Sequence, residues 1–573
     1  MKKIVLLLIC LIGFIAFISC DKDSNNDDSE IRFYLWSDDG GVPSGFNEVL
    51  KNFNENAGKE LDLSLKFAFD TQADYKQNLN LSIASGQNNF DVVFDAQWIY
   101  LQEFAKKNYY YNLTEYFNND SYPGLKANFT PDYLENNYFN NGVYGIPLTQ
   151  TFGEISVAYI RKDFRVECAN DTSYVKHPSI LTSSVVASNL LDGIDNFDEL
   201  EYYLYWVKDN KNGVVPSLCN NDGTWGAWDL INTSTPPTKS AQDYVNASIK
   251  QDILIKQGFV GSAYIKNDEV MAADLSEFLN PDTLKGINSY PAGFTTGDNR
   301  WQEQFQIASR WAKDEIIAKD VMSTTVSNAN FLAGLGGSIV QTINNFSSYE
   351  AQLVAKNPGA ELEIYVNNPV LREKRLGYQQ TDFKAWNFLS IPKTVSLNKV
   401  KKIMKFFDWL FLTEENHDLF QYGIRGVNWD ESKDSNNNYV PGTISNLGFS
   451  TYTFPAFELT WNPNFIRVQM ASDPKVMEYS TFMYDITRYV RILYSEFTFD
   501  PNRTTLLSNA INNAELASNL THRTAYFLGQ VNNPITSWSN ELSTRYSNNS
   551  LQEALRIIQE ELILQLQTYI DSL

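Results

Sequence analysis

Tryptophans with polar neighbours are the residues whose types and spacing most clearly suggest a chemistry. The chain has 12 Trp and 32 Tyr, and several Trp stand close to Asp, Asn, Gln or Arg. Aromatic rings stack on the C–H faces of sugars, while carboxylates and amides hydrogen-bond to sugar hydroxyls. This mixture predicts a carbohydrate site. The candidate side chains are Trp36, Asp38, Asp95, Gln97, Trp98, Trp225, Trp228, Trp301, Trp386 and Trp461.

Each candidate also has a structural interpretation. Asp95 directly follows an apolar run and precedes a helix-like pattern, which is the place of a helix cap. Large aromatic side chains commonly fill cores, so roughly a third to a half of the tryptophans are expected to be buried there. The two interpretations of Asp95 and Trp98 stay open at this level.

Signatures of catalysis are largely missing. The three histidines, His177, His417 and His522, lack metal-ligand spacing, and no nucleophile elbow, phosphate-binding loop or paired-cysteine motif is present. Acidic residues are abundant, so composition alone does not exclude glycoside hydrolysis. We expect a protein that is not an enzyme and that needs no cofactor.

The net charge of −22 argues against binding to nucleic acid, which requires a basic face. The 573 residues are too many for one ordinary domain, and the composition, 43% apolar and 20% charged, is typical of globular proteins.

The N-terminus has the pattern of a bacterial lipoprotein signal peptide. Lys2 and Lys3 precede an apolar stretch, Ile4 to Phe17, and a small residue stands directly before Cys20. We expect cleavage after residue 19, lipidation of Cys20, and a polar tether over 20–30 that holds the protein outside the cytoplasm. An ordinary signal peptide or an uncleaved anchor is the alternative.

Cys168 and Cys219 are the two cysteines that remain after the signal peptide and the lipidated Cys20. They form either a disulfide or two buried thiols.

The first hundred residues alternate between strand and helix patterns. Strands are predicted at 31–36, 61–69 and 91–94, and helices at 45–58 and 73–86. This β-α-β-α-β order is typical of a parallel sheet covered by helices. Ligands bind at the carboxyl ends of the strands in such sheets, and Asp38 and Asp95 to Trp98 follow two of those ends.

Three segments in collinear order carry a family resemblance. They read "NFDVVFDAQWIYLQEFAKKNYYYNLTEYF" (89–117), "NGVYGIPLTQTFGEISVAYIRKDF" (141–164) and "AWNFLSIPKTVSLNKVKKIMKFFDWLFLTEENHDLFQYGIRGVNWD" (385–430). The chain resembles family 1 of the extracellular solute-binding proteins of bacterial ABC importers, in its large lipoprotein branch. Some relatives carry a calcium loop after a helix that matches 195–210 here. In this chain Lys211 takes a ligand position, so we expect no metal.

The resemblance implies an α/β fold with two discontinuous lobes and a ligand cleft between them. We expect lobe one at 31–150 and 392–450, and lobe two at 151–391 and 451–573, with hinge strands near 148–155 and 388–393. The implied protein is a monomer at the cell membrane that captures an oligosaccharide by lobe closure and delivers it to a membrane-embedded permease.

Two alternatives stay open. A SusD-like glycan-binding lipoprotein shares the length, acidity and aromatic content, but that family is largely helical. A receptor of the same fold for peptides is not separated from a sugar receptor by the sequence.

Overall fold

The structure is a computed structural model of the chain. It describes residues 28–573 except 38–39, 87–88, 140, 154, 220–229, 232–238, 255–259, 275–299, 319–326, 373, 375–378, 434–435, 448–450, 470–472, 515, 517–535, 538–539, 541–543 and 545–548. The predicted signal peptide and Cys20 lie outside the described residues, as does most of the predicted tether.

A five-stranded sheet organises the first lobe, in the order β2-β1-β3-β13-β4. β1 pairs in parallel with β2 and β3, as the β-α-β-α-β pattern predicted, whereas β13 runs antiparallel between β3 and β4. The strands are β1 (Glu30–Trp36), β2 (Ser64–Asp70), β3 (Val92–Ala96), β4 (Ile146–Leu148) and β13 (Asn387–Ser390).

Helices cover this sheet because their apolar positions fall on one face. In α2, Phe46, Val49 and Phe53 are buried, and in α17 the buried run includes Phe406 and Phe407. The described helices of this lobe are α2 (Phe46–Glu55), α3 (Ala57–Glu60), α4 (Gln72–Ser85), α5 (Leu101–Lys106), α6 (Thr114–Phe117), α7 (Pro123–Asn128), α8 (Pro131–Glu135), α17 (Leu397–Leu410) and α18 (Glu414–Gln421).

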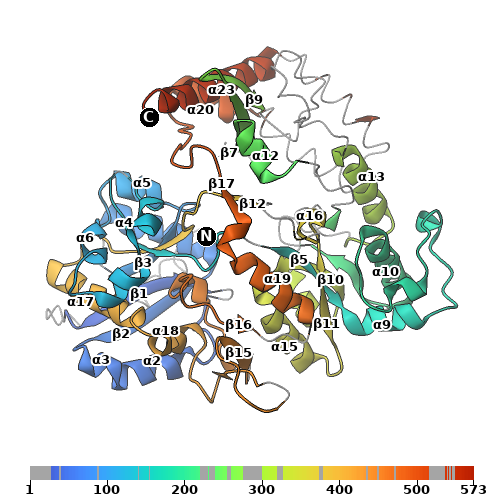
Figure 1. The fold of residues 1–573 in the computed structure, drawn as a ribbon, viewed down its shortest axis with the longest axis horizontal. Helices are drawn as coiled ribbons and strands as arrows, with labels where there is room; N and C mark the ends of the chain where they lie inside the picture. Colours follow the sequence, from blue (N-terminus) through green and yellow to red (C-terminus); the bar gives the residue numbers. More distant parts are fainter. Residues whose placement is uncertain are drawn as a thin grey trace, which may run out of the picture.

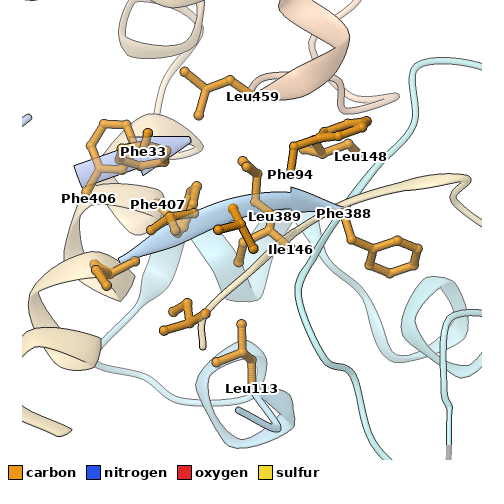
Figure 2. Packing of buried hydrophobic residues seen from close by; sticks show 14 of the residues in the cluster. Phe33, Phe94, Leu113, Ile146, Leu148, Phe388, Leu389, Phe406, Phe407 and Leu459 are labelled. Atoms are coloured by element: carbon orange, nitrogen blue, oxygen red, sulfur yellow. The ribbon is translucent and has the colours of Figure 1, made fainter. Parts of the chain in front are cut away.

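The core of the first lobe joins segments that are far apart in the sequence. Phe94 of β3, Leu148 of β4 and Phe388 of β13 lie together in Figure 2, and Leu459 packs above them. The division into lobes stays a prediction. The packing of β13 and Leu459 favours placing 385–391 and 452–459 with the first lobe, rather than with the second.

A four-stranded sheet in the order β11-β5-β10-β6 organises the second lobe. Alternate residues of β5 point to opposite faces: Val157 and Tyr159 join one apolar cluster, and Ala158 and Ile160 join another. Its strands are β5 (Ser156–Arg161), β6 (Val215–Leu218), β10 (Gly336–Thr342) and β11 (Leu362–Val366), and its described α-helices are α9 (Lys162–Asn170), α10 (Phe197–Asn210), α13 (Arg300–Lys313), α14 (Ser327–Leu332), α15 (Phe346–Lys356), α16 (Pro369–Arg372) and α19 (Pro474–Tyr484).

Figure 1 shows the two lobes side by side, with a smaller C-terminal unit above them. In this unit the three-stranded sheet β7-β8-β9 packs with two helices whose buried residues include Leu507 and Leu562. Its elements are α12 (Ala241–Asn246), β7 (Ile249–Leu254), β8 (Val260–Lys266), β9 (Glu269–Asp274), α20 (Thr505–Ile511) and α23 (Asn549–Ile570).

Two small sheets complete the described strands. β12 pairs in parallel with β17 beside the junction of the lobes, and the order of the other small sheet is β14-β15-β16. These strands are β12 (Gln379–Thr381), β14 (Trp429–Asp430), β15 (Thr443–Asn446), β16 (Val468–Gln469) and β17 (Tyr489–Arg491).

One open question of the sequence has a structural answer. Cys168 and Cys219 are both buried and free, so they form no disulfide in this structure. Among the described residues, no helix combines the length and the apolar character needed to cross a membrane.

Candidate functional site

The turn after β3, which carries Trp98, is hydrogen-bonded to the segment that carries Trp386. The backbone N–H of Gln97 donates to the Trp386 carbonyl at 3.0 Å, and Trp98 Nε1 donates to Asn387 Oδ1 at 3.3 Å. The Gln97 side chain also donates to the Ala385 carbonyl at 2.6 Å. These bonds follow from the antiparallel pairing of β13 with β3, which sets Asn387 opposite Ala96.

Both of these tryptophans remain exposed: Trp98 keeps 42% of its surface accessible and Trp386 keeps 68%. Apolar rings of this size are usually at least partly buried, so two exposed ones at a strand end mark a contact surface. Their polar neighbours are fixed by backbone hydrogen bonds, which keeps the surface in one arrangement.

A row of rings continues from Trp98 toward β1. Phe94 lies 6.4 Å from Trp98 and 6.0 Å from Phe457, measured between ring centroids. Phe457 in turn contacts Trp36 at 5.4 Å and Trp461 at 5.8 Å. We call Trp36, Trp98, Phe457 and Trp461, together with Trp386 on the adjoining segment, the aromatic edge; among the described residues the Trp386 ring contacts no other ring.

The aromatic edge also carries a hydrogen-bond donor. Trp36 Nε1 is shielded from solvent and finds no hydrogen-bond acceptor among the described residues. Buried donors normally have a partner, so this one is a candidate for a ligand oxygen or a bound water. The Trp36 backbone N–H donates to Glu458 at 3.0 Å, which holds β1 against the segment that carries Phe457.

Asp95 does not belong to the exposed surface, and its predicted role in direct ligand contact is corrected. It is completely buried, and its Oδ1 accepts hydrogen bonds from the N–H groups of Ala96 at 2.8 Å and Tyr100 at 3.0 Å. Tyr110 Oη donates to its Oδ2 at 2.8 Å. Burial raises the pKa of Asp95 to about 7, even though these hydrogen bonds oppose the shift. Asp95 therefore holds the turn between β3 and α5.

Lys76 is a neighbour of the aromatic edge that sequence reasoning missed. Its Nζ lies 4.5 Å from the centroid of the Trp98 ring, within the range of a cation–π interaction. Burial lowers the pKa of Lys76. Phe457 and Asn387 were missed as well, although each stands one to four residues from a predicted tryptophan.

The structure does not describe the side chains of the remaining predicted residues. Asp38, Trp225 and Trp228 lie outside the described residues. Trp301 stands near the start of α13 in the second lobe, and its side chain is also outside the described residues. Their roles as ligand-binding residues stay predictions, as do those of Trp36, Gln97, Trp98, Trp386 and Trp461.

Two chain segments that cross between the lobes meet beside the aromatic edge. Phe152 of the first crossing lies 5.1 Å from Phe383 of the second, and Phe383 has a positive φ of 57°. The Arg491 guanidinium lies 5.0 Å from the Phe383 ring centroid, and Arg491 Nη1 donates to Asn136 Oδ1 at 2.8 Å. The last residue of β17 is thereby tied to the C-terminal end of α8 in the first lobe.

No protein-family model matches the sequence, and no curated protein matches it. Solved structures do resemble it. The solute-binding protein NgtS for N-glycan transport from Streptococcus pneumoniae, in complex with Man1GlcNAc, has a TM-score of 0.59 at 15% identity, covering 95% of this chain and 99% of that chain.

Two further structures resemble the chain. The alginate-binding protein AlgQ2, without calcium ion, has a TM-score of 0.52 at 15% identity, covering 94% of this chain and 98% of that chain. FusA, an ABC-transporter substrate-binding protein of S. pneumoniae in complex with kestose, has a TM-score of 0.50 at 13% identity, covering 95% and 99%.

These likenesses establish the class of fold. The chain has the two-lobed α/β fold of ABC-transporter substrate-binding proteins, as the sequence predicted. Membership of family 1 and of its lipoprotein branch is not confirmed, because no family model matches. The SusD-like alternative required a largely helical chain, and the two mixed sheets do not fit it.

Proposed function

We propose that this protein is an extracytoplasmic substrate-binding protein of an ABC importer, and that it captures an oligosaccharide between its two lobes. The observation that carries the proposal is that two exposed tryptophans, Trp98 and Trp386, stand on neighbouring hydrogen-bonded segments at the carboxyl end of β3. Ring faces of this kind stack on the C–H surfaces of sugars, and the neighbouring amides supply hydrogen bonds to hydroxyls.

The two-lobed fold suggests how such a surface would bind its ligand. Proteins of two lobes close around a ligand when groups from both lobes bind the closed state better than the open one. The neighbours support saccharides as the ligand class: NgtS is described with Man1GlcNAc and FusA with kestose, and AlgQ2 is an alginate-binding protein. All three are binding proteins, and we expect no turnover of the sugar here.

A thermal-shift screen tests the proposal. The purified protein is heated with neutral oligosaccharides, uronic-acid oligosaccharides and short peptides, because a ligand that binds only the native state raises the melting temperature. We expect a saturable rise with a saccharide and no release of reducing ends on prolonged incubation. A rise with peptides alone would overturn the carbohydrate assignment while leaving the fold class intact.

The predicted lipid anchor is part of the proposal and has its own test. Lipidation of Cys20 would place the protein on the outer side of the cell membrane, near its permease. Replacing Cys20→Ser in the producing bacterium should abolish incorporation of labelled fatty acid and release the protein from the membrane fraction. Unchanged membrane retention without label would point to an uncleaved N-terminal anchor instead.

A further inference from the structure

A third chain segment connects the two lobes, and a buried histidine contacts it. Residues 460–469 leave the core of the first lobe after Leu459 and lead to α19, whose Val476 packs in an apolar cluster of the second lobe. We call these residues the third crossing segment. His417 of α18 is 1% exposed, and its ring stacks on that of Phe465 in this segment, with 4.8 Å between the ring centroids.

Both ring nitrogens of His417 face hydrogen-bond acceptors. Nε2 lies 3.1 Å from the carbonyl oxygen of Thr460, which begins the third crossing segment, and Nδ1 lies 3.1 Å from Asp418 Oδ1. A backbone carbonyl and an ionised carboxylate only accept hydrogen bonds. A neutral imidazole has a single N–H, so one of its nitrogens would face an acceptor with a lone pair. Both contacts are satisfied only by the imidazolium, which donates from both nitrogens.

Arg467, which lies near the end of the third crossing segment, favours the ionised form of Asp418. Its Nε donates to Asp418 Oδ2 at 2.7 Å in a largely buried pair. A protonated Asp418 would deprive the Arg467 guanidinium of its closest counter-charge, and a nearby opposite charge favours the charged form of a carboxyl. A proton between Asp418 Oδ1 and His417 Nδ1 is therefore placed on the imidazole rather than on the carboxyl.

The ion network around this pair also favours a positive ring. Arg467 Nη2 donates to Glu414 at 3.0 Å and Nη1 donates to Glu431 at 3.5 Å. Arg425 pairs with Glu431 on the other side. Among the described residues, the carboxylates and guanidinium groups of this network are Asp418, Glu414, Glu431, Asp430, Arg467 and Arg425. A third cation at His417 reduces the excess of negative charge in this network.

The third crossing segment also contacts the first crossing. Trp461 follows Thr460, and its carbonyl oxygen accepts a hydrogen bond from the N–H of Thr149 at 3.2 Å. Thr149 directly follows β4, where the chain leaves the first lobe. On the side of the first lobe, Asn462 Nδ2 donates to the Asn128 carbonyl at 3.4 Å. The position of Thr460 therefore affects how both connections join the first lobe.

We propose that His417 is a buried imidazolium whose two N–H groups fasten the third crossing segment to α18, and that loss of its charge loosens this connection between the lobes. This fastening does not depend on which ligand the protein binds. His177 provides an internal contrast, because its Nδ1 accepts a hydrogen bond from the N–H of Ser179 at 3.2 Å. A nitrogen that accepts carries no proton, so the hydrogen bonds of the two histidines require different numbers of ring protons.

Side-chain ¹⁵N NMR of protein labelled only in histidine measures the charge directly. The chain has three histidines, and the variants H177Q and H522Q identify the signals of the other two. At pH 8, about 1.5 units above the value of about 6.5 at which an unpaired histidine releases its proton, we expect both nitrogens of His417 to be protonated and Nδ1 of His177 to be bare. A bare ring nitrogen on His417 at this pH would overturn the proposal. This measurement needs no substitution at His417.

Hydrogen exchange followed by mass spectrometry measures the fastening. H417Q keeps an N–H donor but removes the positive charge, and H177Q is the matched control outside the third crossing segment. We expect the peptides 459–467 and 146–151 to exchange at least tenfold faster in H417Q than in wild type, with no change in β5, and H177Q to leave both peptides unchanged. Unaltered exchange of these peptides in H417Q, or equal acceleration throughout the protein, would overturn the proposal.

Discussion

Residues 384–386 lie between the aromatic edge and a cavity that is lined by α8 and by residues 491–496. These two regions differ in the chemical groups that they present to a ligand. At the aromatic edge, Trp98 and Trp386 present uncharged ring surface whose attraction for sugars depends little on which sugar is bound. In the cavity, Asp132, Glu135 and Arg491 present exposed charges of both signs. The difference indicates where each kind of interaction is available: uncharged stacking at the aromatic edge, and charged groups beside α8.

The largest expected effect comes from the carboxylate that supports the aromatic edge. Asp95→Ala leaves the N–H groups of Ala96 and Tyr100 and the hydroxyl of Tyr110 without their acceptor. Each buried donor left unsatisfied costs about 1–3 kcal/mol, so we expect unfolding free energy to fall by about 3 kcal/mol or more.

Urea unfolding at pH 7 measures this loss, with the exposed Asp198→Ala as the control, for which we expect a change below about 0.5 kcal/mol. A similar small change for both variants would show that Asp95 is not the structural support described here and would return it to the candidate ligand contacts.

The next largest effect concerns affinity for sugars, as distinct from selection between neutral and acidic sugars. Trp386→Ala removes the most exposed ring of the aromatic edge, and central aromatic contacts are worth about 2 kcal/mol or more, which is roughly 30-fold in affinity. Because a ring face does not distinguish charge, we expect neutral and acidic sugars to lose affinity by the same factor. Calorimetry measures both.

The control for Trp386→Ala is Tyr439→Ala, since Tyr439 is 49% exposed and lies away from the strand ends of the first sheet. Its affinity for sugars should equal that of wild type. If Trp386→Ala changed the ratio of the affinities for neutral and acidic sugars, the Trp386 ring would contribute to charge selection, which would contradict this interpretation of the two regions.

A smaller effect concerns pH. The pKa of Asp95 is raised to about 7 in the folded protein, whereas an unfolded Asp releases its proton near pH 3.8. Between these values the folded state holds the extra proton, so this carboxyl makes the protein less stable as pH rises from about 4 through 7. The slope is at most about 1.4 kcal/mol per pH unit for one group.

The Asn side chain of the Asp95→Asn variant does not titrate. The fall in unfolding free energy with rising pH that Asp95 causes should therefore be absent from this variant. The unfolding free energies of both proteins are measured in urea from pH 5 to pH 8. We expect the wild-type value to fall relative to that of the variant as pH rises, and the difference to level off above pH 7. Parallel profiles would contradict the raised pKa.

The smallest expected effect lies at Lys76, whose ammonium sits over the Trp98 ring at 4.5 Å. Lys76→Ala frees that ring to turn, and cation–π contacts at exposed sites are worth about 0.5–1 kcal/mol. We expect sugar affinity to fall about two- to fivefold, with unchanged discrimination between neutral and acidic sugars. Lys66→Ala, on the neighbouring β2, serves as the matched lysine control and should leave affinity unaltered.

Much of the fold was accessible from sequence because its signals are local. The first three strands and two helices alternate within 65 residues, and α17 and α23 show their apolar periods plainly. The insertion of β13 between β3 and β4 was not readable from periodicity, because its partners lie about 240 and 290 residues earlier in the chain. The family resemblance implied a hinge strand near 388–393, but not its place in the sheet.

The candidate site was also predictable from the sequence only in part. Trp98 and Trp386 were chosen from their polar neighbours, and the antiparallel register of β13 brings the segments that carry them to the same end of the sheet. Asp95 shows the limit of such reasoning, because a carboxylate at a strand end fits both a ligand contact and a helix cap until Tyr110 is seen against it. The cavity joins α8, Arg491 and Tyr569, and no spacing in the sequence connects these segments.

The central claim is that Trp98 and Trp386 hold an oligosaccharide, and calorimetric titration of wild type beside the double variant W98A/W386A tests it most directly. With the saccharide that shifts the melting temperature most, the account predicts saturable binding of one ligand per chain in wild type and a loss of at least a hundredfold in the double variant. Equal affinity in the two proteins, or binding confined to peptides, would contradict it.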